Sequence, residues 1–392
     1  MPEKNLDFDR IIDRRNTKSV KYDLAAKKGM PEDVLPLWVA DMDFRVSSYI
    51  QEAIARQVEH GVFGYSDTGE EYFEAVKGWM KRHHGWDVEA DWLVKTPGVV
   101  FALSLAVKAF TEPGDSVLIQ QPVYYPFKRV VEVNGRRTIS NTLVYENNKY
   151  FMDFEDFEEK IIREKIKLFI LCNPHNPVGR VWTEDELVRI GDICQKHHVI
   201  VVSDEIHGDF AFKGKHHVFT GLKKEYGEFT VTCTAPSKTF NLAGLQLSNI
   251  FISNPELRRA FRRQLDIVGY EEPNIMGMVA CEAAYRDGDE WYEAMLEYVA
   301  GNIAFTREYV EKNIPGVTMA EHEGTYLVWL DFRQLGMTGE ELEEMIVQRA
   351  RLWLDGGAMF GESGTGFQRV NVACPRKILK EALERMKGAV LA

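Results

Sequence analysis

Short apolar runs alternate with helical stretches between about residues 95 and 255. The runs are almost continuously apolar, as expected of strands that are buried on both faces of a sheet. The expected strands are Val117–Gln120, Leu168–Leu171, Val199–Val202, Thr230–Thr234 and Asn249–Ile252. Segments with helical periodicity lie between these strands. In one of them, Leu187, Ile190 and Cys194 share one face of a helix predicted over 183–196, with Thr183 as its N-cap. This alternation predicts a parallel sheet with helices on both faces.

The pattern changes after about residue 290. The elements expected there are a long amphipathic helix from Trp291 to about Asn313, a strand over Thr325–Phe332, a helix over Gly339–Arg351 and a strand over Phe367–Val372. Pro375 then begins a terminal helix, where its missing N–H costs nothing. The fold class is therefore α/β, with a large domain of residues 46–290. Residues 1–45 and 291–392 are expected to form a smaller α+β domain.

Composition narrows the class of protein. The chain has 392 residues, 45% of them hydrophobic, and a length that usually gives two domains. Its net charge of −12, with no basic block, argues against a nucleic-acid partner. The polar N-terminus and the lack of a long apolar run predict a cytoplasmic protein without a membrane partner. The five cysteines have no CxxC spacing, so we expect reduced, buried thiols and no metal site.

Lys238 is the most informative single residue. It follows the apolar run 229–233, within the segment TAPSKTFN at 234–241. A lysine at the end of a parallel strand is costly to bury unless its amine is used. Pyridoxal phosphate is the usual reason, because its aldehyde forms a Schiff base with a desolvated lysine. The alternative is an ordinary solvated lysine, so other segments have to decide.

Two motifs that follow predicted strands support pyridoxal phosphate as the cofactor. Asp204, in the segment VSDEIH at 202–207, can pair with a protonated pyridine nitrogen, although a lone aspartate more often caps a helix. His207 can reach the ring hydroxyl, or be an ordinary surface histidine. The loop NPHNPVGR at 173–180 is stiffened by two prolines and a glycine, and it projects Asn176 from a strand end. An asparagine held in this way can donate to a ring oxygen, which a plain tight turn would not need.

A fourth segment, TPGVVFALS at 96–104, opens an apolar helix. Gly98 at its start leaves the backbone N–H groups of Val99 and Val100 free to hold a phosphate at the positive end of the helix dipole. The segment QPVYYP at 121–126 follows another strand. Tyr124 can stack on a flat heteroaromatic ring, while Tyr125 is the tyrosine expected to pack in the core.

Together these motifs carry a family resemblance. The strings NPxNPxG, SDEI and SKTF, in this order, resemble the fold-type I pyridoxal phosphate enzymes of the class I/II aminotransferase superfamily. The segment LPLWVADMDF at 35–44 and the segment KTFNLAGLQ at 238–246 are similar to a narrower branch, the MalY/PatB-like cystathionine β-lyases and cysteine-S-conjugate β-lyases. The resemblance covers essentially the whole chain and implies a large domain with a mostly parallel sheet.

The resemblance also implies residue roles. Lys238 would form the Schiff base with pyridoxal phosphate, Asp204 would hold the ring nitrogen, and Tyr124 would stack on the ring, these three being the catalytic residues. Cofactor binding would add Asn176, His207, Gly98, Val99, Val100 and Ser237.

Substrate binding would fall to Arg369, Ala40 and Asn176, with Arg369 gripping the α-carboxylate as a bidentate partner. The alternative for Arg369 is an ordinary surface position on its strand. Tyr65 would reach the cofactor phosphate of the other subunit, which implies a homodimer with shared sites.

Two departures from the aminotransferase pattern affect the expected reaction. Gln246 stands where those enzymes usually carry a phosphate-binding arginine, and His207 stands where they usually carry a tyrosine. A transaminase must hold an untethered cofactor in every turnover, whereas a lyase returns it to its lysine. A weaker phosphate grip is therefore easier to tolerate in a lyase. Ala235 also replaces the usual serine, which leaves Ser237 as the candidate for phosphate contact.

The sequence therefore predicts a pyridoxal phosphate-dependent carbon–sulfur β-lyase acting on a sulfur-containing amino acid and releasing a thiol, pyruvate and ammonia. An aminotransferase of an aromatic or apolar amino acid is the first alternative. A regulatory protein that binds a transcription factor, with lyase activity secondary, is the second.

Overall fold

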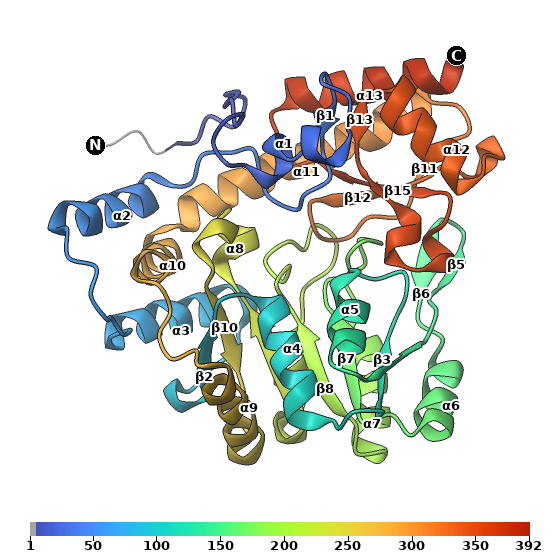
Figure 1. The fold of residues 1–392 in the computed structure, drawn as a ribbon. Helices are drawn as coiled ribbons and strands as arrows, with labels where there is room; N and C mark the ends of the chain where they lie inside the picture. The colour runs from blue at the N-terminus through green and yellow to red at the C-terminus, as the bar shows by residue number, and fades with distance from the viewer. Residues whose placement is uncertain (1–4) are drawn as a thin grey trace.

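A computed structural model of the chain describes residues 5–392 and contains two main sheets. Figure 1 shows the larger sheet in the lower half of the molecule and the smaller one in the upper half, with the polypeptide ends at the top. The larger sheet has the strand order β2-β10-β9-β8-β7-β3-β4. Its strands are β2 (Leu93–Thr96), β10 (Ser248–Phe251), β9 (Thr230–Thr234), β8 (Ile200–Asp204), β7 (Leu168–Cys172), β3 (Ser116–Ile119) and β4 (Arg137–Ser140).

The alternation of side chains along the central strands explains the helices on both faces. In β7, Leu168 and Ile170 pack with α4 (Val99–Phe110), α5 (Pro126–Val133) and α9 (Pro255–Val268). Phe169 and Leu171 point to the opposite face, against α6 (Phe154–Glu164) and α7 (Glu184–Lys196). A strand buried on both faces needs an unbroken apolar run, which is the pattern that predicted it.

The larger sheet contains one antiparallel strand, although the alternation of strands and helices predicted parallel pairing. β10 pairs antiparallel with both β9 and β2, whereas β3, β4, β7, β8 and β9 pair in parallel. The sheet is therefore mostly parallel. The helix α7 begins after Thr183, whose side chain forms a capping box with Glu186, as the N-cap prediction requires.

The smaller sheet is antiparallel, in the order β11-β12-β15-β14. Its strands are β11 (Thr318–Met319), β12 (Leu327–Asp331), β15 (Phe367–Asn371) and β14 (Asp355–Gly356). The helices around it are α11 (Asp289–Asn313), α12 (Gly339–Glu344) and α13 (Arg376–Leu391). The helix expected to reach Arg351 ends at Glu344 and continues as a π turn over Met345–Arg349. Arg351 has a φ of 54°, in the left-handed region, so a right-handed helix cannot include it.

The remaining elements lie at the ends and edges of these sheets. They are α1 (Val20–Asp23), β1 (Leu35–Pro36), α2 (Ser48–His60), α3 (Glu70–His84), β5 (Val144–Glu146), β6 (Lys149–Phe151), α8 (Pro236–Thr239), α10 (Ile275–Asp287) and β13 (Leu352–Trp353). β1 pairs in parallel with β13, which places the N-terminal segment beside the C-terminal part of the chain.

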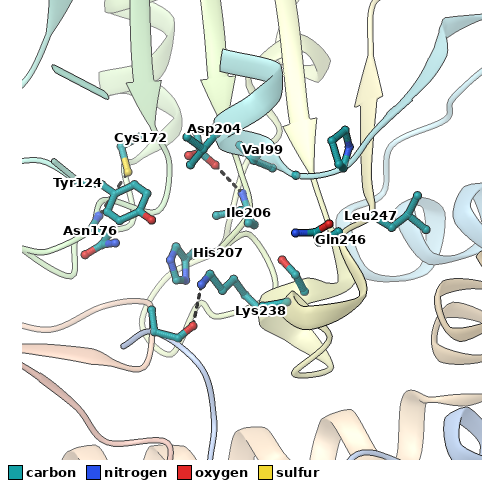
Figure 2. Close-up of a pocket in the computed structure, with 16 residues that line it drawn as sticks. Val99, Tyr124, Cys172, Asn176, Asp204, Ile206, His207, Lys238, Gln246 and Leu247 are labelled. Atoms are coloured by element: carbon teal, nitrogen blue, oxygen red, sulfur yellow. Dashed lines mark hydrogen bonds between the residues drawn. The ribbon is translucent and has the colours of Figure 1, made fainter. Parts of the chain in front are cut away.

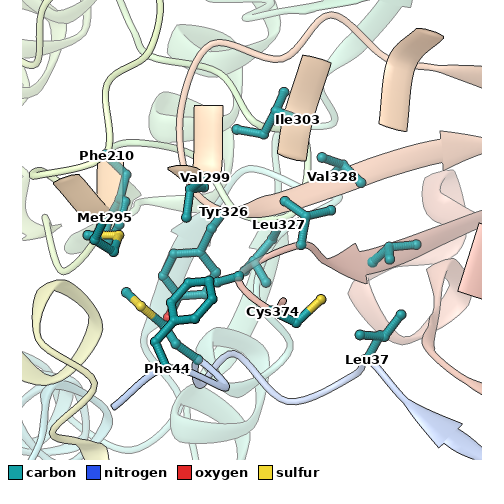
Figure 3. Packing of buried hydrophobic residues seen from close by; sticks show 14 of the residues in the cluster. Leu37, Phe44, Phe210, Met295, Val299, Ile303, Tyr326, Leu327, Val328 and Cys374 are labelled. Atoms are coloured by element: carbon teal, nitrogen blue, oxygen red, sulfur yellow. The ribbon is translucent and has the colours of Figure 1, made fainter. Parts of the chain in front are cut away.

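A continuous core joins the two halves of the molecule. Figure 3 shows part of this core, in which Leu37 and Phe44 of the N-terminal segment belong to the same buried cluster as Met295 of α11 and Leu327 of β12. The same buried cluster includes Trp79 of α3, so residues on both sides of the expected division at 45/46 share it. The domain boundaries of 1–45, 46–290 and 291–392 stay a prediction.

Three further features bear on the expectations drawn from composition. All five cysteines are buried and free, as their apolar contexts predict. Within residues 5–392, no helix is long and apolar enough to cross a membrane. No group of three or more metal-ligating side chains is placed to hold a metal ion in that same part of the chain.

Candidate active site

A cavity of about 180 Å³ lies at the carboxyl edge of the seven-stranded sheet (Figure 2). The predicted site residues that line it are Ala40, Gly98, Val99, Val100, Tyr124, Asn176, Asp204, His207, Ser237 and Lys238. They meet because β2, β3, β7, β8 and β9 run in the same direction, so the loops after them share one edge. The other lining residues are Pro97, Cys172, Ile206, Ala243, Gln246 and Leu247.

Lys238 lies on the short helix α8, directly after β9. Its Nζ donates to the carbonyl oxygen of Ala40 at 2.7 Å, as Figure 2 shows. Burial and, to a lesser extent, the positive charge of Arg369 lower the pKa of this amine to about 8, while Asp41 and Asp204 oppose the shift. An amine with this pKa is partly uncharged near neutral pH, as a nucleophile or a general base must be.

Asp204 is the last residue of β8 and is 5% exposed. Its Oδ1 accepts a hydrogen bond from the backbone N–H of Ile206 at 3.1 Å. Burial raises the pKa of the carboxyl to about 7, although the Ile206 hydrogen bond and the charge of Lys238 act in the opposite direction. A buried carboxyl with a raised pKa is one that a cationic ligand group would return to its charged form.

Asn176 connects the cavity to the smaller sheet. Its Oδ1 accepts a hydrogen bond from Nη1 of Arg369, on β15, at 3.0 Å. Arg369 is buried, and its Nη2 donates to the backbone oxygen of Trp38 at 2.9 Å and to the carboxylate of Asp355. Burial raises the pKa of Asp355, although the charge of Arg369 opposes that shift. The guanidinium is therefore behind the cavity wall, bound to a lining residue rather than lining the cavity itself.

Tyr124 and His207 line the same cavity as Asp204 and lie below it in the view of Figure 2. His207 is 3% exposed, and its Nδ1 has no hydrogen-bond partner in the described structure. Burial, with the nearby charges of Lys238 and Arg369, holds the pKa of His207 well below its usual value, so the ring is neutral. Burial likewise raises the pKa of Tyr124, which keeps its hydroxyl protonated.

The start of α4 is open toward the cavity. Gly98 is its N-cap, and no side chain caps the first turn of this helix. A Cβ built on Gly98 would meet no heavy atom within 4 Å, so packing within the chain does not require a glycine here. The uncapped N–H groups and the positive end of the helix dipole suit an anion. Ser237 and Gln246 line the same cavity and can add polar contacts.

Of the predicted site residues, Arg369 and Tyr65 do not line the cavity; Arg369 contacts the lining residue Asn176, whereas Tyr65 lies away from it. Tyr65 is 97% exposed, on an extended segment between α2 and α3. Sequence reasoning also missed several neighbours of the site, among them Tyr326 and Asp355. Tyr326 donates through its hydroxyl to the Ala40 carbonyl oxygen at 2.9 Å. No local motif marked either residue, since both contact the site through partners remote in sequence.

These features fit pyridoxal phosphate. The cavity lining brings together a buried amine, a buried carboxyl and a tyrosine ring, groups that suit an aldehyde, a cationic ring nitrogen and a stacked ring. His207 has an unsatisfied ring nitrogen, and the first turn of α4 has uncapped N–H groups that suit a phosphate. These groups are compatible with the cofactor that the resemblance implies, and the role of each residue stays a prediction.

Comparison with known proteins decides the family. A family model described as aminotransferase class I and II matches residues 32–386. The chain belongs to this family. Membership confirms the resemblance carried by the motifs and extends over most of the chain.

Relatives within the class I and II aminotransferase family point to a narrower group. The cystathionine beta-lyase PatB of Bacillus subtilis is 42% identical over 98% of this chain and 100% of its own length. The crystal structure of cystalysin from Treponema denticola, described as containing pyridoxal 5'-phosphate, superimposes with a TM-score of 0.95 at 39% identity. It covers 98% of both chains.

A PLP-bound C–S lyase from Staphylococcus hominis is also similar, with a TM-score of 0.92 at 32% identity and 98% coverage of both chains. These structures confirm the fold-type I architecture expected from the sequence. The aminotransferases among the curated relatives are more distant, at 25 and 26% identity.

Proposed function

We propose that this protein is a pyridoxal phosphate-dependent carbon–sulfur β-lyase. It cleaves the bond between Cβ and sulfur in an α-amino acid and releases a thiol, pyruvate and ammonia. The observation that carries the proposal is the placement of a buried amine, Lys238, and a buried carboxyl, Asp204, on one cavity that also fits the cofactor. Similarity to PatB over the full chain favours the lyase over other reactions of the family.

The cofactor would be held by residues already in place. Tyr124 would stack on its ring, Asn176 and His207 would bind the ring oxygen, and Gly98, Val99, Val100 and Ser237 would bind the phosphate. When bound, pyridoxal phosphate supplies an electron sink that stabilises negative charge at the substrate Cα.

Lys238 would act as the general base. Its amine, once freed by the incoming substrate amine, is positioned to remove the Cα proton. The lowered pKa favours this role, because an uncharged amine is available near neutral pH. The carbonyl oxygen of Ala40, 2.7 Å from Nζ, would hold the amine in reach of the cavity between proton transfers.

Asp204 would keep the ring nitrogen protonated. Its burial excludes water from the contact, and a cationic partner would lower the carboxyl pKa again, so that the pair is charged and hydrogen-bonded. The electron sink depends on this charge, since a neutral ring accepts electrons less well.

Arg369 would bind the α-carboxylate of the substrate. Its guanidinium is fixed by Asn176 and Asp355, so its direction is set before substrate arrives. Ala40 and Asn176 would complete the substrate contacts at the same end of the cavity.

We also propose a homodimer with shared sites. Tyr65 is 97% exposed, and its neighbours Val62 and Phe63 are 64% and 58% exposed. An exposed apolar and aromatic segment is typical of an interface. In the dimer, the partner's Tyr65 would contact the cofactor phosphate, as the family resemblance implies.

An aminotransferase is the second candidate, built on the same residues. Gln246 lines the cavity where an arginine would strengthen the phosphate grip, which supports the lyase. The experiment that separates the two incubates the holoenzyme with cystathionine and measures pyruvate with and without a keto-acid acceptor. Pyruvate without acceptor supports the lyase, whereas product formation that requires the acceptor supports the aminotransferase. The regulatory alternative stays a prediction from the sequence.

A further inference from the structure

Asp209 lies behind the cavity and takes no part in the function proposed above. Its side chain is 8% exposed and is surrounded by three donors. Trp79 Nε1 donates to Oδ1 at 3.1 Å, His84 Nε2 lies 2.8 Å from the same oxygen, and Thr239 Oγ1 donates to Oδ2. The backbone oxygen of Asp209 accepts from the hydroxyl of Tyr292 at 2.6 Å. The residue therefore ties together α3, α8 and α11.

The carboxylate of Asp209 stays charged in this buried place. Burial alone would raise its pKa, but the hydrogen bond and charge of His84, with the bonds from Thr239 and Trp79, outweigh burial and lower it. A charged carboxylate accepts hydrogen bonds and donates none, so all three donors have a fixed direction.

Thr239 is the residue directly after Lys238, and it is fully buried. Both residues lie on α8, which spans only Pro236–Thr239. A helix of one turn has little stability of its own, so its orientation depends on tertiary contacts. Adjacent side chains on a helix point in directions about 100° apart. Fixing Thr239 on the Asp209 side therefore fixes the direction in which Lys238 enters the cavity.

A second anchor lies just after α8, two residues beyond Thr239. Asn241 accepts a hydrogen bond from the backbone N–H of Met42 at 2.9 Å and donates to the backbone oxygens of Met42 and Phe44. This anchor joins the chain after α8 to the segment that carries Ala40. On α8 itself, Thr239 is the residue that the Asp209 carboxylate holds.

We propose that Asp209 is a positioning residue for Lys238 and acts through the hydroxyl of Thr239. The inference rests on the proposed function only in taking Lys238 as the lysine that bonds the cofactor. The bond from Thr239 keeps Nζ pointed at the site of bond formation, so its loss slows the steps that use the amine and leaves substrate binding by Arg369 in place.

The test begins with Thr239→Val, which removes the hydroxyl and keeps the volume. We expect kcat to fall by about tenfold or more, as misplacing a reacting group does, with KM changed less than about twofold. The apo protein should also recapture added pyridoxal phosphate about tenfold more slowly, followed by absorbance. Thr239→Ser restores the hydroxyl and should be close to wild type in both measurements.

Thr306→Val is the matched control. Thr306 is equally buried, and its hydroxyl donates to the Asn302 backbone oxygen within α11 at 2.8 Å. Its loss should leave kcat and cofactor recapture within about twofold of wild type. Thermal unfolding of both valine variants establishes that they are folded to the same extent.

Asp209→Asn keeps the shape and removes the charge, and it covers the case in which Thr239→Val does not fold. If Asp209 acts through Thr239, kcat of the double variant is reduced by a much smaller factor than the product of the two single-variant reductions. Three outcomes overturn the proposal. The first is a kcat for the double variant that is reduced by the full product of the two single effects. The others are a Thr239→Val variant with a kcat no lower than that of Thr306→Val, and a Thr239→Ser variant with a kcat as low as that of Thr239→Val. The wild-type holoenzyme is first treated with borohydride, which should fix the cofactor to Lys238. If the cofactor is not fixed to Lys238, the proposed function is overturned, and this inference with it. The other outcomes concern Asp209 alone.

Discussion

The amine of Lys238 lies 2.7 Å from the carbonyl oxygen of Ala40, a residue 198 positions earlier in the chain. The same oxygen accepts a hydrogen bond from Tyr326. The amine is thus held by a neutral acceptor instead of a carboxylate. A neutral acceptor does little to oppose burial, in agreement with the lowered pKa of this lysine.

The first prediction concerns cofactor attachment. Because Lys238 is the buried amine on the cavity, the purified holoenzyme should be yellow, and borohydride should fix the cofactor to the peptide that contains Lys238. Lys238→Ala should fold and lose at least about a thousandfold in kcat, as loss of a covalent catalyst and general base does. Lys213→Ala, which changes a lysine with a 66% exposed side chain, is the control and should keep full activity. Label recovered on another lysine contradicts the assignment.

The second prediction concerns the ring nitrogen. Asp204→Asn keeps the shape of the side chain and removes its charge, so the ring is no longer held protonated. We expect kcat to fall at least about a hundredfold, comparable to the loss of a strong electrostatic contact, with a smaller change in KM. Steady-state kinetics on cystathionine measure both. An unchanged kcat with a raised KM would show that Asp204 only shapes the cavity.

The third prediction is a pH effect on the apo protein. The pKa of Asp204 is about 7 in the folded protein and ordinarily 3.8, so the folded state binds more protons than the unfolded state between these values. Stability contributed by this group is therefore present below about pH 4 and is lost as pH rises to 7, by up to about 4 kcal/mol. The free energy of unfolding is measured with denaturant for the apo wild type and for apo Asp204→Asn. The wild-type value minus the variant value should fall as pH rises from about 4 to 7. A difference that is constant with pH refutes it.

The fourth prediction concerns the α-carboxylate. Arg369→Lys keeps the positive charge but loses the planar fork, so KM should rise about ten- to hundredfold. The effect on kcat should be smaller, since the reacting atoms are elsewhere. Arg333→Lys is the matched control, because Arg333 also pairs with an aspartate, Asp331, at 2.7 Å. Asp331 does not line the cavity, whereas Arg369 is bound to the lining residue Asn176. Equal KM changes in the two variants would return Arg369 to a structural role.

The fifth prediction concerns the shared site. Tyr65→Phe and Lys238→Ala homodimers should both be weak, for different reasons. Mixing them under exchange conditions places both lesions in one site of the heterodimer and leaves the other intact. Activity should recover to about half of wild type per heterodimer, and the Tyr65→Phe loss reflects a charged hydrogen bond of about 1.5–3 kcal/mol. Mixtures no better than the average of the parents, or a fully active monomer, would place Tyr65 outside the site.

Much of the fold could be predicted because its signals are local. A strand buried on both faces must be apolar throughout, so β7, β8 and β9 are visible as runs in the sequence. The direction of β10 was missed, since a short apolar run looks the same in parallel and antiparallel pairing. The edge strands β2 and β4 were missed because their side chains are partly exposed and give no such run.

The residues of the candidate site also divide into those that the sequence predicts and those that it does not. Residues such as Asn176 and Asp204 follow strand ends, and the carboxyl edge of a mostly parallel sheet gathers them without any knowledge of packing. Tyr326, Asp355 and Asp209 reach the site through contacts with remote segments. No local pattern distinguishes them from ordinary core or strand residues. Motifs therefore reveal the groups that line the cavity, while the groups that orient them are found only from the coordinates.

The hydrogen bond between Asn176 and Arg369 joins the loop after β7 of the larger sheet to β15 of the smaller one. The group that would touch the cofactor ring and the group that would hold the substrate carboxylate are therefore mechanically one unit. A substitution that moves one of these two side chains should therefore also move the other. The distance between the cofactor ring and the substrate carboxylate is then fixed by this fold. We therefore expect changes in the size of the leaving thiol to be accommodated by cavity-lining residues other than Asn176, with Asn176 and Arg369 left unchanged.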